Sequence, residues 1–253
     1  MILDAIIAAT AERVARMPED AEETVEAPRA ATGFYDAVRR TKRTNAIIAE
    51  IKAASPSRGI ICSDIDPRGF ALSMVSSGCA ALSVITEPRF FHGSDTFLPA
   101  VRNAVSVPIL RKDFVIDPRQ VAASRALGAD AVLLITAVLK DRLPDFVELA
   151  RSYSLEPLVE VHTGRELEVA LSSGTRMIGI NNRNLKDMSV DLSVTKRLAP
   201  PARDCGCRVV SESGFVWPCD VRRFRDIVDG FLIGSSIVSA RNPQKKLEGF
   251  LFA

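Results

Sequence analysis

The stretch IIAEIKAASPS, which runs from Ile47 to Ser57, ends an apolar run in a pair of opposite charges. Glu50 and Lys52 are two residues apart, so on a strand they share one face. Because an unpaired charge in a dry core is costly, that face must reach a pocket where the strand ends. Ser55 then opens a polar loop. An acid and an amine at the carboxyl end of a strand are typical of a barrel active site, although a structural ion pair explains this stretch equally well.

The rest of the chain repeats this order of an apolar run, a polar cluster and an amphipathic segment. The predicted strands are Ile47–Ile51, Ala80–Ile85, Pro108–Leu110, Ala131–Ile135, Pro157–Val161, Met177–Ile180, Arg208–Val210 and Gly230–Ile233. The predicted helices are Pro67–Ser76, Pro118–Leu127, Leu143–Ser152, Gly164–Ser172, Leu192–Leu198, Pro218–Ile227 and Pro243–Phe250. This alternation predicts an α/β fold, a (β/α)8 TIM barrel. The competing fold, a doubly wound sheet, usually carries a glycine-rich phosphate loop after its first strand, and AASPSRG does not match one.

The length of 253 residues suits one large α/β barrel or two small domains. Because the predicted strands and helices alternate along the chain, we predict a single barrel domain over residues 1–253, in which residues 1–43 form an N-terminal helical extension. An amphipathic helix is predicted over residues 2–16 and a short helix over Phe34–Arg40, with an acidic loop over residues 17–31 between them. Because these elements precede the first strand, we expect them to dock across an end of the barrel.

Composition argues against several classes of protein. The formal net charge of +2 is too small for a nucleic-acid footprint, so we predict no nucleic-acid partner. No apolar run reaches the length of a membrane span and no signal peptide is evident, so we predict a cytoplasmic protein without a membrane partner. An odd count of five cysteines argues against a disulfide framework. The spacing of Cys205 and Cys207 suits zinc poorly, so we predict no metal site.

Polar side chains follow every predicted strand, and in a barrel all these strand ends meet at one mouth. The residues are Glu50 and Lys52, Thr86 and Glu87, Arg111 to Asp113, Thr136, Glu160 and His162, Asn181 to Asn184, Ser211 to Gly214, and Gly234 to Ser236. Small residues follow the last two strands, so their backbone N–H groups can closely approach a phosphate. The sequence therefore favours a phosphate site at these two turns over turn glycines alone.

Lys112 and Glu160 are the candidate acid and base. Lys112 shares its strand parity with Leu110 and should point into the barrel, whereas Arg111 should face helices or solvent. A desolvated lysine among other cations loses proton affinity and becomes a usable acid. A partly buried glutamate gains proton affinity and becomes a usable base. His162 shares the parity of Glu160 but lies further out, and we expect a loop residue or one that begins a helix.

Together these segments resemble the indole-3-glycerol-phosphate synthase family. The matching segments are IAEIKAASPS, ALSVITEPRFFHGS, VPILRKDFVIDPRQ, LEPLVEVHT, IGINNRNLKDMSVDL, VVSESG and GFLIGSSIV, and ILDAIIAATAERVA looks like the family's opening helix. The resemblance implies a barrel that converts 1-(2-carboxyphenylamino)-1-deoxyribulose 5-phosphate to indole-3-glycerol phosphate, carbon dioxide and water in tryptophan biosynthesis. It also implies a small phosphorylated substrate and no metal or organic cofactor.

The resemblance further implies roles for individual residues. Lys112 looks like the general acid on the ribulose carbonyl, and Glu160 like the general base of the dehydration. The residues that resemble the supporting catalytic shell are Glu50, Lys52, Asn181 and Ser213. Those that resemble substrate contacts are Ser55, Phe90, Phe114, Arg183, Glu212, Gly214, Gly234 and Ser235. The two phenylalanines would lie on the anthranilate ring and the last three residues would bind phosphate, while either Lys52 or Arg183 would hold the substrate carboxylate.

Two other interpretations remain open. One is a sugar-phosphate barrel that works through a Schiff base on Lys52 or Lys112. The other is an inactive barrel kept as a binding protein, against which the intact Glu50, Lys112 and Glu160 count. We expect a monomer or a weak homo-oligomer.

Overall fold

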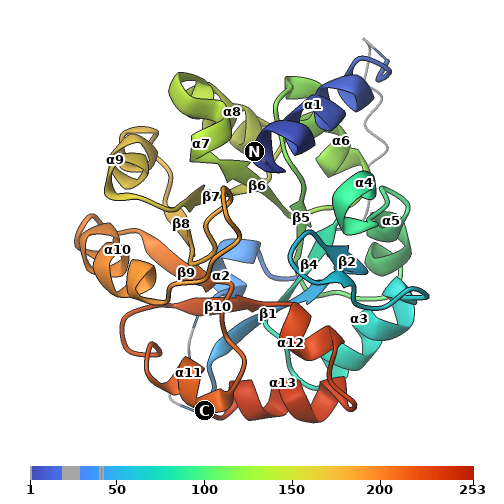
Figure 1. The fold of residues 1–253 in the computed structure, drawn as a ribbon, viewed down its shortest axis with the longest axis vertical. Helices are drawn as coiled ribbons and strands as arrows, with labels where there is room; N and C mark the ends of the chain where they lie inside the picture. The colour runs from blue at the N-terminus through green and yellow to red at the C-terminus, as the bar shows by residue number, and fades with distance from the viewer. Residues whose placement is uncertain (1, 19–28, 40, 42) are drawn as a thin grey trace.

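The computed structural model describes residues 2–18, 29–39, 41 and 43–253. It confirms the predicted barrel, a closed parallel sheet in the order β1-β10-β9-β8-β7-β6-β5-β4 (Figure 1). Its strands are β1 (Ala46–Ile51), β4 (Ala81–Ile85), β5 (Ile109–Lys112), β6 (Ala131–Ile135), β7 (Glu156–Val161), β8 (Met177–Asn181), β9 (Arg208–Glu212) and β10 (Gly230–Ile233). Each predicted run falls on one of these strands.

Helices surround the sheet (Figure 1). The larger ones are α3 (Pro67–Ser76), α5 (Phe97–Arg102), α6 (Pro118–Ala126), α8 (Leu143–Ser152), α9 (Gly164–Ser172), α10 (Ser193–Asp204), α11 (Pro218–Arg222) and α13 (Pro243–Leu251). Short helices after strands are α4 (Pro88–Phe91), α7 (Thr136–Leu139), the 3-10 helix η1 (Lys140–Arg142) and α12 (Ser235–Val238). The sequence did not predict α5, because its 6 residues are too few to show a helical period.

Local signals explain where several helices begin. The side chains of Asp66, Asp117 and Asn242 cap α3, α6 and α13 by accepting backbone N–H groups, and a proline follows each cap. The predicted end of α10 was wrong, because the helix runs through Pro200 and Pro201 to Asp204. Its buried residues on both sides of the prolines pack on the barrel, and this packing offsets the missing backbone bonds.

The barrel interior changes from apolar to charged along the strands. Four strands place a buried apolar side chain inside and, two residues nearer the carboxyl end, a charged one: Ile48 and Glu50, Leu110 and Lys112, Leu158 and Glu160, Val210 and Glu212. Residues of opposite parity form the larger core between sheet and helices. The layer of charged side chains therefore lies at the end of the barrel where the strands have their carboxyl ends, and the layer of apolar side chains fills the interior next to it.

The N-terminal extension meets both ends of the barrel, which confirms the expected docking. Ile6 of α1 (Ile2–Val14) is buried at the mouth. Phe34 of α2 (Phe34–Ala37) is buried at the opposite end, where the guanidinium groups of Arg176 and Arg208 each lie over the ring of Tyr35. The second helix is shorter than predicted, and most of the predicted acidic loop lies outside the described residues.

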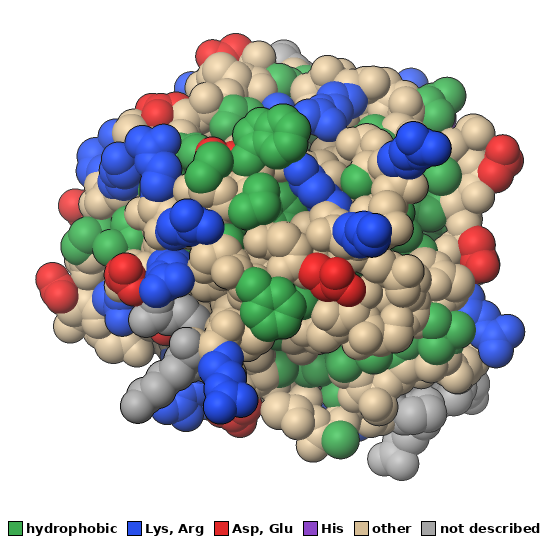
Figure 2. Space-filling model, turned by 90° about the horizontal axis from the view of Figure 1, so that it is seen from below, with side chains coloured by type: hydrophobic (Ala, Val, Ile, Leu, Met, Phe, Trp, Pro, Cys, Tyr) green, Lys and Arg blue, Asp and Glu red, His purple; other side chains and the backbone are tan. Residues whose placement is uncertain are grey.

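No helix of the described part of the chain has the length and apolar character needed to cross a membrane. Within those same residues, no group of three or more His, Cys, Asp or Glu side chains is arranged to hold a metal ion. The cysteines are free thiols. Figure 2 shows Lys and Arg side chains interspersed with apolar and other polar groups over one face of the outer helices.

Candidate active site

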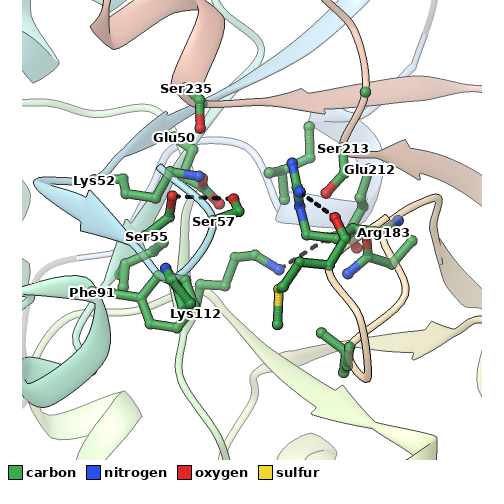
Figure 3. Close-up of a pocket in the computed structure, with 18 of the residues that line it drawn as sticks. Glu50, Lys52, Ser55, Ser57, Phe91, Lys112, Arg183, Glu212, Ser213 and Ser235 are labelled. Carbon is green, nitrogen blue, oxygen red and sulfur yellow. Dashed lines mark hydrogen bonds and ion pairs between the residues drawn. The ribbon is translucent and has the colours of Figure 1, made fainter. Parts of the chain in front are cut away.

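A cavity of about 260 Å³ opens at the carboxyl ends of the strands (Figure 3). All predicted site residues but one line it: Glu50, Lys52, Ser55, Lys112, Phe114, Glu160, Asn181, Arg183, Glu212, Ser213, Gly214, Gly234 and Ser235. The exception is Phe90. The fold thus gathers residues that are up to 185 positions apart in the chain, from Glu50 to Ser235, around one space.

The neighbour of Phe90 takes its place in the cavity wall. Phe91 lines the cavity, and its ring centroid lies 6.1 Å from that of Phe114. Phe90 and Phe91 both belong to α4, which Glu87 caps by accepting the backbone N–H groups of the helix. Successive side chains on a helix point in different directions, so only one of the two can face the cavity. The aromatic pair at the mouth is therefore Phe91 and Phe114.

Lys112 lies at the centre of a charged cluster on the cavity floor. Its Nζ is 3.0 Å from Oε2 of Glu212 and 3.3 Å from Oε2 of Glu160. The Lys112 side chain is 17% exposed, whereas those of Glu160 and Glu212 are 2% and 1% exposed. Figure 3 shows Lys112 extending between the Glu50 and Lys52 side of the cavity and the Glu212 side. Its proton therefore lies where a substrate atom can reach it.

The charges around Lys112 reverse the predicted pKa shifts. Burial disfavours the charged amine, but Glu212, Glu160 and Glu50 outweigh burial and raise the pKa of Lys112. Burial likewise favours a neutral Glu160, but Lys112, His162 and a hydrogen bond from Asn181 outweigh it and lower the pKa of that carboxyl. Both predicted directions were wrong, because Lys112 faces carboxylates and not other cations.

Glu212 is the carboxyl whose pKa is raised. Burial and the negative charge of Glu160 outweigh the attraction of Lys112 and raise the pKa of Glu212 to about 7. Its Oε1 is buried and has no hydrogen-bond partner among the described residues. A Cβ on Gly179 would lie 2.2 Å from that oxygen, so only glycine leaves room for it. No local pattern marks Gly179 for this role, because its partner lies on another strand.

Glu50 and Lys52, the two charges of the opening stretch, form an ion pair. Lys52 Nζ lies 2.6 Å from Oε1 of Glu50. The hairpin of β2 (Ala54–Ser55) and β3 (Gly59–Ile60) follows directly, and it brings Ser55 and Ser57 to the cavity wall. The pair therefore borders the substrate space and is not a closed structural contact.

The turn after β9 has an unusual backbone. Ser213 and Gly214 both have positive φ values, of 64° and 93°. Asn182 holds the turn, because its Nδ2 donates to the carbonyl oxygens of Glu212 and Ser213 at 2.9 and 3.1 Å. Such strain persists at functional sites when the surroundings impose it. Asn182 was noted in the sequence only as a strand-end residue, and its part in positioning this turn was missed.

Arg183 is the partly buried cation at the edge of the cavity. Its Nη1 donates to the carbonyl oxygen of Met188 at 2.9 Å, and its backbone N–H donates to Oδ1 of Asn181 at 2.9 Å. Burial and, next, the positive charge of Arg58 lower its pKa. Among the described residues it forms no ion pair. An anionic group of a ligand would relieve the repulsion between the two guanidinium groups.

The sequence matches one family of known proteins over almost its whole length. Residues 3–250 match the family model described as Indole-3-glycerol phosphate synthase. The chain is 43% identical to the protein of that name from Bordetella pertussis, over 97% of each chain. It is 44% identical to that of Carboxydothermus hydrogenoformans, over 81% of this chain and 78% of the other.

Solved structures share the fold at low identity. A structure described as KGPDC from Streptococcus mutans covers 81% of this chain and 94% of its own, with a TM-score of 0.62 at 15% identity. One described as native KDPGal covers 83% and 94%, with a TM-score of 0.59 at 16% identity. At this identity the likeness concerns the barrel alone.

Proposed function

The chain belongs to the indole-3-glycerol phosphate synthase family, and from this premise we propose that its mouth cavity closes the indole ring with Lys112 as general acid and Glu160 as general base. The chain is a carboxy-lyase of tryptophan biosynthesis that acts on a phosphorylated substrate. The reaction converts 1-(2-carboxyphenylamino)-1-deoxyribulose 5-phosphate to indole-3-glycerol phosphate, carbon dioxide and water. The observation that carries the proposal is the contact of Lys112 with two buried glutamates.

The first half of the reaction needs an acid. The ring carbon that bears the carboxylate attacks the ketone, and negative charge develops on the ketone oxygen. The surrounding carboxylates keep Lys112 protonated before this step. An alkoxide is more basic than an amine, so it takes the proton in spite of the raised pKa of Lys112. The carboxylates therefore keep Lys112 protonated at the start of each catalytic cycle.

The second half needs a base. Loss of carbon dioxide restores the aromatic ring, so the chemistry requires no electron sink. The new hydroxyl then takes a second proton, which we assign to Lys52 on the cavity wall, and leaves as water while a proton leaves the carbon beside the nitrogen. Glu160 is suited to take this proton, because Lys112, His162 and Asn181 favour its ionised form. We assign Glu50, Lys52, Asn181 and Ser213 to positioning these groups and the substrate.

The two ends of the substrate match different parts of the wall. Ser213-Gly214 and Gly234-Ser235 line one region, where the left-handed turn and the start of α12 leave backbone N–H groups for a phosphate. Phe114 and Phe91 offer apolar surface for the anthranilate ring. Lys52 and Arg183 both border the cavity, and either is able to hold the carboxylate.

We also propose that one chain forms a complete site and works as a monomer or a weak homo-oligomer, because all the groups assigned above come from a single chain. Light scattering across a range of protein concentrations tests this. A cytoplasmic location rests on the biosynthetic role, and cell fractionation tests it.

Indole fluorescence during substrate consumption tests the proposed roles. Lys112→Ala and Glu160→Gln should each lower kcat by about 10²-fold or more. Lys245→Ala, which removes an exposed lysine of α13, is the matched control and should retain kcat. Near-normal turnover in both site variants would show that the roles are misassigned. Borohydride with substrate should trap no adduct, whereas a Schiff-base mechanism would give one on Lys52 or Lys112.

A further inference from the structure

His162 lies behind Glu160 and bridges two carboxylates. Its Nδ1 is 3.1 Å from Oε2 of Glu166, and its Nε2 is 3.4 Å from Oε1 of Glu160. His162 is not among the residues that line the cavity. Side-chain exposure falls along this series, from 21% at Glu166 to 13% at His162 and 2% at Glu160. The imidazole therefore connects a partly exposed carboxylate with a buried one.

The series continues to the proposed acid. The other oxygen of Glu160, Oε2, lies 3.3 Å from Nζ of Lys112. Glu166 is held in place because its Oε2 also accepts the backbone N–H of His162 at 2.8 Å. The four side chains thus form a continuous line of proton-carrying groups from the surface at α9 to the cavity floor.

The reaction requires a supply of protons to this site. The ketone oxygen leaves as water and gains two protons, while the carbon beside the nitrogen loses one. The carboxylate leaves as neutral carbon dioxide, and its electron pair stays in the ring. Each turnover therefore takes up one proton in net, which balances the negative charge lost with the carboxylate. Product in the mouth would stand between solvent and Lys112, so a route through the protein could return the proton before product leaves.

We propose that Glu166, His162 and Glu160 form a proton-uptake relay that returns a proton from solvent to Lys112 between turnovers. Nδ1 receives the proton on the Glu166 side, and Nε2 delivers a proton on the Glu160 side. The imidazole is suited to this because its two nitrogens face different carboxylates. The relay rests on the roles proposed above for Lys112 and Glu160.

Two further observations support the relay. Nε2 of His162 is buried and has no aligned hydrogen-bond partner among the described residues, so a small movement toward Glu160 gives it one. Burial disfavours the imidazolium, but the hydrogen bond with Glu166 and the charges of Glu160, Glu166 and Glu212 raise the pKa of His162. Proton uptake by the ring is thereby favoured.

Rapid-mixing kinetics distinguish the relay from a structural role. Enzyme equilibrated before mixing already carries the proton on Lys112, so His162→Gln should complete its first turnover at nearly the wild-type rate. Its steady-state rate in dilute buffer should fall by about tenfold or more, which appears as a burst. In His162→Ala, added imidazole should restore the steady-state rate. Glu166→Gln should behave like His162→Gln, because the amide keeps an acceptor oxygen but does not take up and release a proton as a carboxyl does.

Glu168→Gln is the matched control, since Glu168 is an exposed acid on the same helix outside the series, and it should show no burst. Equal losses in the first turnover and the steady state, without rescue by imidazole, would overturn the relay. An unchanged steady-state rate in His162→Gln would also overturn it. Both results leave the roles of Lys112 and Glu160 intact, because those roles are tested separately by the turnover of Lys112→Ala and Glu160→Gln.

Discussion

Gly234 lies directly against Glu50. A Cβ on Gly234 would come within 2.3 Å of Oε1 of Glu50, the oxygen that binds Lys52 at 2.6 Å. The strand register explains this contact, because the preceding residues Ala49 and Ile233 pair across β1 and β10. The absence of a side chain at Gly234 therefore leaves room for the Glu50–Lys52 ion pair. This role is separate from the phosphate contact that we propose for the same turn.

Gly234→Ala should consequently impair catalysis more than folding. The methyl group must displace the Glu50 carboxylate, and a misplacement of about 1 Å in a catalytic cluster can cost about 10²-fold in rate. We expect kcat to fall by about that factor. Gly164→Ala is the control, because a Cβ there meets nothing within 4 Å, and it should retain kcat. A wild-type kcat in Gly234→Ala would show that the position of Glu50 is unimportant.

Glu212 should give the free enzyme an ionisation near neutral pH. With its pKa raised to about 7, the carboxyl changes charge there, and the pH profile of kcat/KM reports groups of the free enzyme. Glu212→Gln should remove that ionisation from the profile measured between about pH 5 and about pH 9. If the pH profile of kcat/KM of Glu212→Gln still showed the same ionisation, that ionisation would belong to another group.

The same residue should affect stability in a defined direction. A carboxyl with a raised pKa binds more protons in the folded than in the unfolded state, so its contribution to stability falls as pH rises through this window. The free energy of unfolding of the wild type should therefore decrease relative to that of Glu212→Gln from about pH 5 to about pH 8, measured by urea denaturation. A difference between the two proteins that does not change with pH over this range would mean that Glu212 is ionised throughout.

Strand periodicity was sufficient to predict which charged residues face the cavity. Lys112 and Glu160 point inward because each shares parity with a buried apolar residue two positions earlier, and this is local information. Their pKa directions were wrong because they depend on which charges meet across the barrel. Glu212 reaches Lys112 from 100 positions away, and no local pattern reports that distance of 3.0 Å.

The other site features that the sequence did not predict also depend on contacts between distant parts of the chain. Phe91 and not Phe90 faces the cavity because of how α4 is oriented, and adjacent phenylalanines look alike in the sequence. Gly179 leaves room for a side chain of β9, and Asn182 holds a turn that follows the same strand. Each role depends on a partner brought near by barrel closure, which spacing along the chain does not encode.

Asp113 should contribute strongly to stability. It is buried and its carboxylate binds Arg13 at 2.7 Å, the Thr86 hydroxyl at 2.6 Å and Arg111 at 3.2 Å. Asp113→Asn leaves the buried Arg111 without this charge, so the free energy of unfolding at neutral pH should fall by about 3 kcal/mol. Asp117→Asn loses only a partly exposed pair with Arg119 and should cost about 0 to 1 kcal/mol.

The loss in Asp113→Asn should shrink in acid. Burial alone would raise the pKa of Asp113, but Arg111 and Arg13 outweigh it and lower that pKa. A lowered folded pKa gives stability that is present above the unfolded value of about 3.9 and is lost as pH falls through the folded value. Urea denaturation at neutral and at strongly acidic pH measures both quantities. An equal loss at both would mean that packing, and not charge, is what the substitution removes.

Ser235→Asp should weaken substrate binding with little effect on chemistry. Ser235 begins α12 beside Gly234 and lines the part of the cavity that we assign to the phosphate, whereas Lys112 is assigned to the ketone. A carboxylate at position 235 therefore places a negative charge against the proposed phosphate. We expect KM to rise by about tenfold or more, and inorganic phosphate to compete less well, while kcat changes less. Ser152→Asp adds the same charge at an exposed position on α8 and controls for net charge. If KM and phosphate inhibition were unchanged in Ser235→Asp, the phosphate would have to bind elsewhere in the mouth, and the assignment of Gly214, Gly234 and Ser235 would fail together.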